Sequence, residues 1–122
     1  MSAPPPSPEN AEVIPVPPEV IEAELKETVR RCRNFKTLAT MKPKAASKLL
    51  MKRMRLIYEA IDDREALKYC LHIKRVIQIR IEYGTNGELK KMETMLQVVN
   101  RLREKYFDRL LDTYLDQIGN NF

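Results

Sequence analysis

The residues of this sequence with the clearest chemical potential are basic ones, which can bind anions. Eleven Lys and Arg residues fall between Lys26 and Arg55, and Glu27 is the only acid among them. From residue 56 onward, eleven basic and eleven acidic residues cancel, so the net charge of +5 is concentrated in the first half of the folded part. Side chains of this type bind phosphate groups, because each neutralised phosphate releases counterions. The predicted contacts are Arg30, Arg31, Arg33, Lys44, Lys48, Lys52 and Arg55.

The basic block leaves two interpretations open. It contacts nucleic acid, or it is a solvated helix face or a docking surface for an acidic protein. Phe35 is the one aromatic residue within the block, so there is no platform on which bases could stack. If nucleic acid is bound, we therefore expect binding without sequence preference.

Residue types that support catalysis are scarce. The chain has one histidine, His72, and two well-separated cysteines, Cys32 and Cys70, with no CxxC pair and no glycine-rich phosphate loop. We expect no enzyme activity, no metal, no cofactor and no small-molecule substrate. His72 is interpreted as a neutral, hydrogen-bonded or solvent-edge histidine, and both cysteines as small core residues with free thiols, typical of a reducing compartment.

Prolines mark the boundary of the folded part. Seven of the eight prolines lie in residues 1–18, a stretch without Lys, Arg or aromatic residues. This composition predicts a disordered Pro-rich tail over residues 1–18, followed by a helical domain over residues 19–122. No run approaches the roughly twenty apolar residues of a membrane span, so no membrane contact is expected.

Apolar spacings of three and four predict an all-α fold, a bundle of four main helices. The first is expected over residues 19–38 and the second from about Pro43 to residue 61. The third follows directly, opened by Asp62 with Glu65 three positions on, and it ends at Gly84 in a left-handed conformation. Thr85 and Glu88 form a second such capping pair, and the fourth helix runs from about residue 87 to residue 118.

The third helix is predicted to be the central one, because apolar residues surround most of its circumference. Arg75 and Arg80 interrupt this surface, and an unpaired buried arginine is costly. Each must reach solvent, a carboxylate or another subunit, and the last helix offers Glu93, Glu104 and Asp108. Three neighbouring helices leave apolar surface uncovered, which indicates an interaction subunit within an oligomer.

Three segments carry a resemblance to a known family: LLMKRMRLIYEAI (49–61), LKYCLHIKRVIQIRIEYG (67–84) and METMLQVVNRLREKYFDRLLDTYLDQIG (92–119). In this order they resemble the helical N-terminal domain of the Psf-one subunit of GINS, a four-subunit replication complex. The matching positions are Leu56, Tyr58, Glu59, Arg75, Ile79, Arg80, Glu82, Tyr83, Gly84, Tyr106, Leu110, Tyr114, Leu115 and Gly119.

The resemblance implies a nuclear, non-catalytic scaffold subunit that packs against sister GINS subunits in the eukaryotic replicative helicase. The implied subunit interface comprises Tyr58, Arg75, Ile79, Arg80, Tyr83, Tyr106 and Tyr114. Two alternatives remain open beside it. One is a sequence-nonspecific nucleic-acid-binding protein that uses the basic block, and the other is a free-standing helical adaptor that captures a partner helix.

Overall fold

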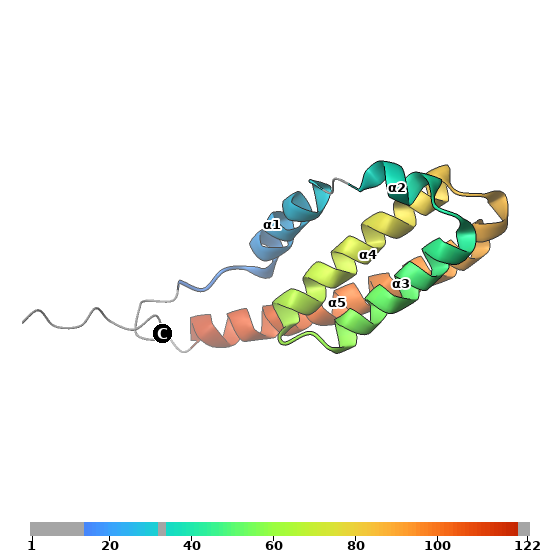
Figure 1. The fold of residues 1–122 in the computed structure, drawn as a ribbon. Coiled ribbons are helices and arrows are strands. Elements are labelled where there is room, and N and C mark those ends of the chain that lie inside the picture. The colour runs from blue at the N-terminus through green and yellow to red at the C-terminus, as the bar shows by residue number, and fades with distance from the viewer. Residues whose placement is uncertain (1–13, 32–33, 120–122) are drawn as a thin grey trace, which may run out of the picture.

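The computed structural model describes residues 14–31 and 34–119, and this part of the chain contains helices and no strands (Figure 1). The elements are α1 (Pro18–Arg30), α2 (Phe35–Thr40), α3 (Pro43–Tyr58), α4 (Asp63–Tyr83), a 3-10 turn (Asn86–Glu88) and α5 (Leu89–Gly119). The predicted all-α bundle of four main helices is confirmed, with the short α2 added. Most of the predicted tail, residues 1–13, lies outside the described residues, and Pro18 belongs to α1 rather than to the tail.

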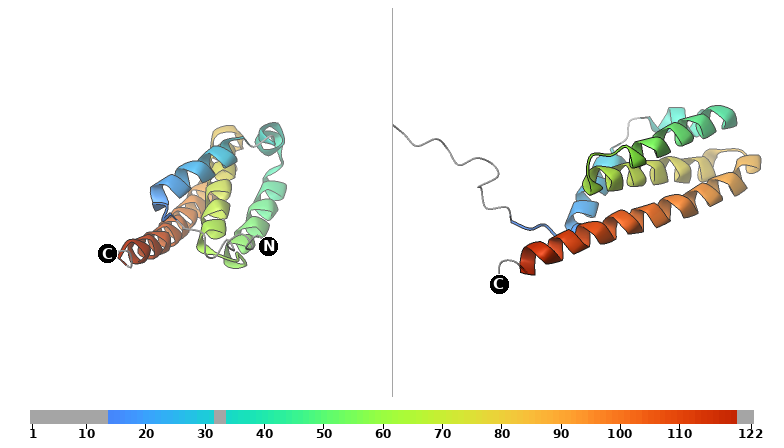
Figure 2. Two further views of the ribbon diagram at one scale, coloured as in Figure 1. Left: turned by 90° about the vertical axis from the view of Figure 1, so that its left-hand side faces the viewer. Right: turned by 90° about the horizontal axis from the view of Figure 1, so that it is seen from below.

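Helix α4 is the centre of the bundle, as predicted. It packs against α1, α2, α3 and α5, which surround it in both views of Figure 2. Leu67, Cys70, Ile73 and Ile77 of α4 are almost completely buried. Burial of an Ile or Leu side chain stabilises a fold by roughly 1.5–3 kcal/mol, which exceeds the small helix-propensity penalty of β-branched residues. Packing therefore decides the conformation of this β-branched stretch.

The prediction of one helix over residues 19–38 is wrong. The chain forms two helices there, α1 and α2, and the predicted core residue Cys32 and the predicted contact Arg33 lie outside the described residues. Leu38 of α2 is buried in the common core. The separate α2 also brings its last carbonyl groups to α4, where they accept hydrogen bonds from Arg80. These tertiary contacts outweigh the local helical pattern.

The predicted capping pairs are confirmed. The Asp62 side chain accepts a hydrogen bond from the Glu65 backbone N–H at 2.7 Å and opens α4. Thr85 and Glu88 form a reciprocal capping box, which opens the 3-10 turn that leads into α5.

Gly84 ends α4 for a reason that the sequence pattern did not predict. Its φ of −80° and ψ of −176° are extended, so the predicted left-handed conformation is wrong. A Cβ at this position would collide with the carbonyl oxygen of Arg80 and would lie 2.5 Å from Oε2 of Glu88. Glycine is therefore required here by lack of space.

Helix α5 runs antiparallel to α4 and is longer than it. Arg109 of α5 lies beside the start of α4, since its Nε is 3.2 Å from Oδ1 of Asp63. Residues 110–119 continue beyond this point, a length of about 15 Å at 1.5 Å per residue. The right-hand view of Figure 2 shows this end of α5 projecting past the start of α4.

Candidate functional site

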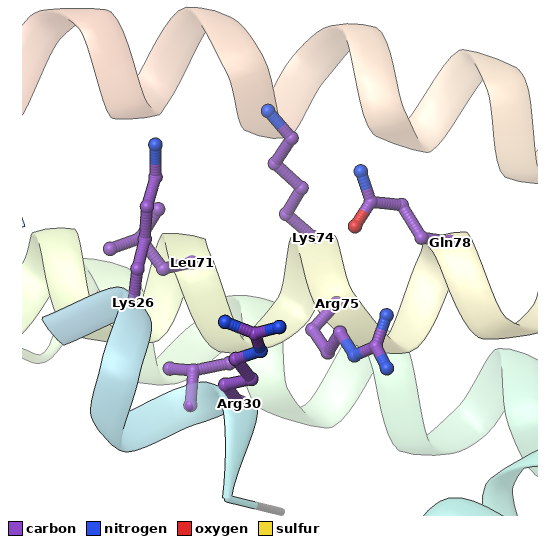
Figure 3. A pocket seen from close by; sticks show the side chains of 7 residues that line it. Lys26, Arg30, Leu71, Lys74, Arg75 and Gln78 are labelled. Atoms are coloured by element: carbon purple, nitrogen blue, oxygen red, sulfur yellow. The ribbon is translucent and has the colours of Figure 1, made fainter. Parts of the chain in front are cut away.

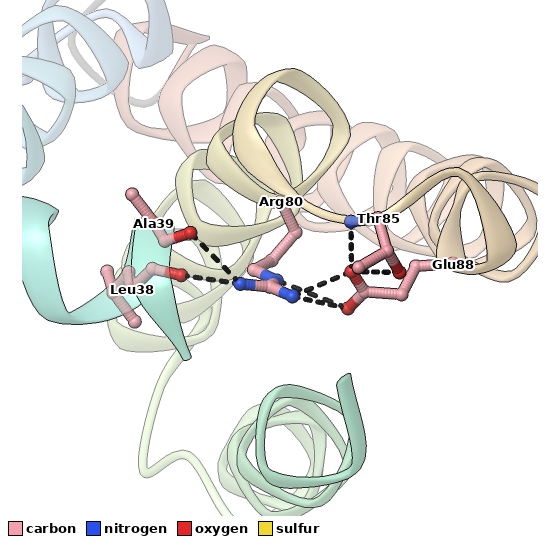
Figure 4. Close-up of polar contacts among 5 residues, drawn as sticks. All are labelled: Leu38, Ala39, Arg80, Thr85 and Glu88. Atoms are coloured by element: carbon pink, nitrogen blue, oxygen red, sulfur yellow. Dashed lines mark hydrogen bonds and ion pairs between the residues drawn. The ribbon is translucent and has the colours of Figure 1, made fainter. Parts of the chain in front are cut away.

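A buried ion pair joins the two ends of the α4–α5 turn (Figure 4). Arg80 is 2% exposed, and its Nη2 lies 2.7 and 2.6 Å from the two carboxylate oxygens of Glu88. Its Nη1 donates to the carbonyl oxygens of Leu38 at 3.0 Å and Ala39 at 3.3 Å. The guanidinium group thus links α2, α4 and the capping turn of α5.

The charge of Glu88 is stabilised within this cluster. Burial raises the pKa of its carboxyl group, but hydrogen bonds from Arg80 and from the Thr85 backbone N–H outweigh burial and hold the pKa below its ordinary value. Of the three destinations expected for Arg80, the structure selects a carboxylate. The carboxylate is that of Glu88, whereas the acids suggested on the last helix were Glu93, Glu104 and Asp108.

Two predicted interface residues are therefore internal to the chain. Arg80 and its neighbour Ile79 are each 2% exposed. Arg80 meets partners within its own chain, and Ile79 belongs to the hydrophobic core. Their positions support a structural role in the bundle and leave neither side chain free to contact another subunit.

The remaining predicted interface residues differ in exposure. Tyr58 is 68% exposed, Tyr114 is half-buried, and Tyr106 is buried. Tyr83 is half-exposed, and its ring packs edge to face against Phe35 of α2 at a centroid distance of 5.2 Å. Only some of the predicted set thus remains available on the surface.

Four basic side chains line a groove between α1 and α4, which we call the basic groove (Figure 3). Lys26 and Arg30 come from α1, and Lys74 and Arg75 from α4. The groove has a volume of about 490 Å³, and its other lining residues are Val29, Leu71 and Gln78. In Figure 3, Lys26 and Lys74 point toward α5, while Arg30 and Arg75 lie on the side away from it.

One carboxylate lies near this groove and is already shared. Glu22 contacts Lys26 at 3.1 Å and Arg103 of α5 at 2.5 Å. Burial raises the pKa of Glu22, but the hydrogen bonds from Arg103 and Lys26 more than offset this, so its pKa lies below the ordinary value. Within residues 14–31 and 34–119, neither Arg30 nor Arg75 forms an ion pair.

Lys74 has cationic surroundings. Burial, followed by the charges of Arg103 and Lys26, lowers the pKa of its ammonium group, and the charge of Glu22 opposes this shift only in part. A cation that is partly removed from water among other cations favours the approach of an anion.

The structure describes six of the seven predicted basic contacts and places five of them at two sites. Arg30 lies in the basic groove, and Arg31 is exposed and near Glu27, at 3.8 Å. The other four are exposed along one side of α3, which we call the α3 basic face: Lys44, Lys48, Lys52 and Arg55. The contribution of Lys74 and Arg75 to the groove was not predicted, because only the packing of α1 on α4 brings these distant segments together.

Exposed and half-buried apolar residues lie at the end of the bundle where α5 projects. Tyr58 and Ile61, at the α3–α4 turn, line a hollow of about 410 Å³ with Tyr106 and Arg109. Ile61 is 88% exposed. Further along α5, four apolar residues lie outside the core cluster of the described chain: Leu111, Tyr114, Leu115 and Ile118. We call these six apolar residues, Tyr58, Ile61 and the four on α5, the open end.

His72 and Cys70, the residue types that could support catalysis, are held by contacts within the bundle. Nη1 of Arg53 lies 2.8 Å from Nδ1 of His72, and burial together with the Arg53 charge lowers the pKa of the imidazole. His72 is hydrogen-bonded, as predicted, and its lowered pKa favours the neutral form. Cys70 is fully buried, also as predicted, and burial raises the pKa of its thiol to about 12.

In the part of the chain that the structure describes, no group of three or more His, Cys, Asp or Glu side chains is arranged to hold a metal ion. No helix in that part is both long enough and apolar enough to cross a membrane.

Comparisons of this chain with protein-family models, with curated proteins and with solved structures find no match.

Proposed function

We propose that this protein is a non-catalytic helical scaffold subunit of a GINS-like complex. In this role it packs against sister subunits in the eukaryotic replicative helicase, in the nucleus, and supports the initiation of DNA replication and fork progression. The proposal rests on the resemblance of roughly residues 22–119 to the helical domain of the Psf-one subunit, together with one feature of the surface.

That feature is the open end. Residues 110–119 of α5 extend past the start of α4. Tyr58, Ile61 and Leu115 are exposed there, and Leu111, Tyr114 and Ile118 are half-buried outside the core cluster. An exposed group of large apolar side chains marks a contact site for another protein. Tyrosine is enriched at such sites because it presents a large apolar surface with a polar tip.

The residues of the resemblance sort into two groups that suit a scaffold. Arg80 and Gly84 hold the α4–α5 turn together, Arg80 through its ion pair and Gly84 through its lack of a side chain. Tyr58 and Leu115 are exposed at the open end and remain free for a partner. A hairpin with its turn held in this way can present the exposed residues without rearranging, as in most pre-organised complexes.

The test is purification of the tagged chain from its native cells, followed by mass spectrometry in moderate salt. We expect the three sister GINS subunits in stoichiometric amounts. The double variant Tyr114→Asp and Leu115→Asp should lose them, because a charge buried at an apolar interface is costly. Thr113→Asp with Gln117→Asp, at two exposed positions of the same helix, adds the same charge, serves as the matched control and should retain them.

Two results would contradict this proposal. One is recovery of the chain without sister subunits, and the other is equal recovery of those subunits with the open-end variant and with wild type. Circular dichroism of both variants separates loss of the subunit contact from loss of the fold. We expect both variants to remain folded, because the substituted residues lie outside the core cluster.

The α3 basic face supports a second candidate, sequence-nonspecific binding of nucleic acid. Lys44, Lys48, Lys52 and Arg55 repeat at helical spacings of three and four, are all exposed, and have no ion pair within the described residues. Binding by such a row should weaken steeply with salt. Binding to an oligonucleotide that is unchanged between low and high salt, or unaffected by Lys48→Gln with Lys52→Gln, would exclude this candidate.

A further inference from the structure

We propose that the basic groove between α1 and α4 is a binding site for a compact anion that carries more than one phosphate group, such as a polyphosphate or the phosphate tail of a nucleotide. This inference is independent of the scaffold function, because the groove shares no residue with the open end.

Cations from two helices converge on this groove. Lys26 and Arg30 on one helix, and Lys74 and Arg75 on another, line a single opening. The two helices hold these cations close together through core contacts that include Leu25, so the repulsion among them is imposed by the fold. An anion in the groove would relieve this repulsion, and one carboxylate, shared with Arg103, is the counter-charge nearby.

Hydrogen-bond donors dominate the polar lining of the groove. Lys and Arg offer only donors, and Gln78 adds a neutral amide that can donate as well. Arginine binds phosphate oxygens in a planar, two-point fashion, and lysine acts as a mobile point charge. A phosphate group accepts hydrogen bonds from several directions around its tetrahedron, which suits donors that approach from two helices and from both sides of the groove.

The size of the groove suits a compact anion, because its volume of about 490 Å³ accommodates a small group of phosphates. Its lining contains no aromatic side chain, so a base has no stacking surface there, and the phosphates are the part of the ligand that is recognised. An extended strand would instead suit the α3 basic face, where the cations follow the length of a helix.

The experiment is titration calorimetry of the full chain with sodium tripolyphosphate at low salt. Orthophosphate, a tetraglutamate peptide and a single-stranded oligonucleotide serve as comparison ligands. We expect one saturable site for tripolyphosphate per chain. Orthophosphate and tetraglutamate should bind at least about tenfold more weakly, because each lacks part of the multiple charge-assisted contacts.

Two double variants with the same change in net charge locate the site. Lys74→Gln with Arg75→Gln should weaken tripolyphosphate binding by about tenfold or more. Lys48→Gln with Lys52→Gln, on the α3 basic face, should leave it within about twofold of wild type. Arg30→Gln changes the groove from α1 instead of α4. Because the Arg30 side chain is exposed, we expect this variant to remain folded. Thermal unfolding of each variant checks that it is folded.

Several results would overturn the inference. Equal weakening by the two double variants would show a general charge effect. Absence of saturable tripolyphosphate binding would exclude the site, and equal affinity for tetraglutamate would exclude a phosphate ligand. Oligonucleotide binding that depends on Lys74 and Arg75, without tripolyphosphate binding, would show that the groove holds an extended strand.

Discussion

At the scale of single residues, buried charge is what distinguishes this bundle from a purely apolar one. Arg80 and Glu88 are both nearly inaccessible to solvent, and each satisfies the other. The pair also holds the carbonyl groups at the end of α2 and the N–H that opens the turn into α5. Such a pair is expected to specify the geometry of the α4–α5 turn more than to add net stability, because removing both charges from water is costly.

Replacing both members of the pair should cost less than the sum of the two single replacements. Arg80→Met leaves the Glu88 carboxylate buried without its partner, and we expect a loss of about 3–5 kcal/mol in the free energy of unfolding. The double variant Arg80→Met with Glu88→Met should lose less than the sum of the two single variants, by about 2 kcal/mol. Urea unfolding of the four proteins measures this coupling. Strictly additive losses would show that the two side chains act independently.

At the scale of the secondary-structure elements, the arrangement of the helices depends on α4. Its apolar residues face every neighbouring helix, so the other helices are stable only when packed on it. Helix α2 illustrates this dependence, because a segment of six residues is too short to be stable alone. It is stabilised by burial of Leu38 and by the hydrogen bonds from Arg80.

A charge in the middle of α4 should therefore unfold the domain. Ile77 is completely buried, and Ile77→Asp should reduce the free energy of unfolding by more than about 3 kcal/mol. Lys90 is exposed in the first turn of α5, so Lys90→Asp should change the free energy by about 0.5 kcal/mol or less. Thermal melting compares the two variants. Similar melting temperatures would show that the buried face of α4 is assigned wrongly.

For the molecule as a whole, acid should act in two separate steps. The folded state lowers the pKa of His72 from 6.5, so the unfolded state takes up a proton first as the pH falls below that value. It also lowers the pKa values of Glu22 and Glu88 from 4.5, so their ionised forms stabilise the fold above that pH. Both effects make the unfolded state bind more protons, and both decrease stability on acidification.

Urea unfolding at about pH 7.5, 5.5 and 4 tests this expectation. Stability should decrease over the first interval because His72 is protonated in the unfolded state. It should decrease again below about pH 4.5, as the carboxylates take up protons. The variant His72→Gln, which keeps a hydrogen-bond acceptor for Arg53, should lose the first decrease and retain the second. An identical first decrease in wild type and variant would assign it to another group.

Local patterns in the sequence were sufficient for most of the elements. The helical periods gave the all-α class and the central position of the third helix, and the Asp62–Glu65 and Thr85–Glu88 pairs gave two helix starts. These features depend on neighbours within a few residues along the chain, and such interactions are readable without a fold. The pattern over residues 19–38 failed because contacts of Leu38 with the distant α4 outweighed it.

The tertiary structure alone decided the partner of Arg80, the reason for Gly84 and the composition of the basic groove. Arg80 and Glu88 are eight residues apart, and their contact depends on the exact path of the turn between them. Lys26 and Lys74 are separated by almost half of the folded chain and meet only when α1 packs on α4. Sequence determined which charges and apolar faces exist, and packing determined which of them meet, because long-range contacts are fixed by the fold as a whole.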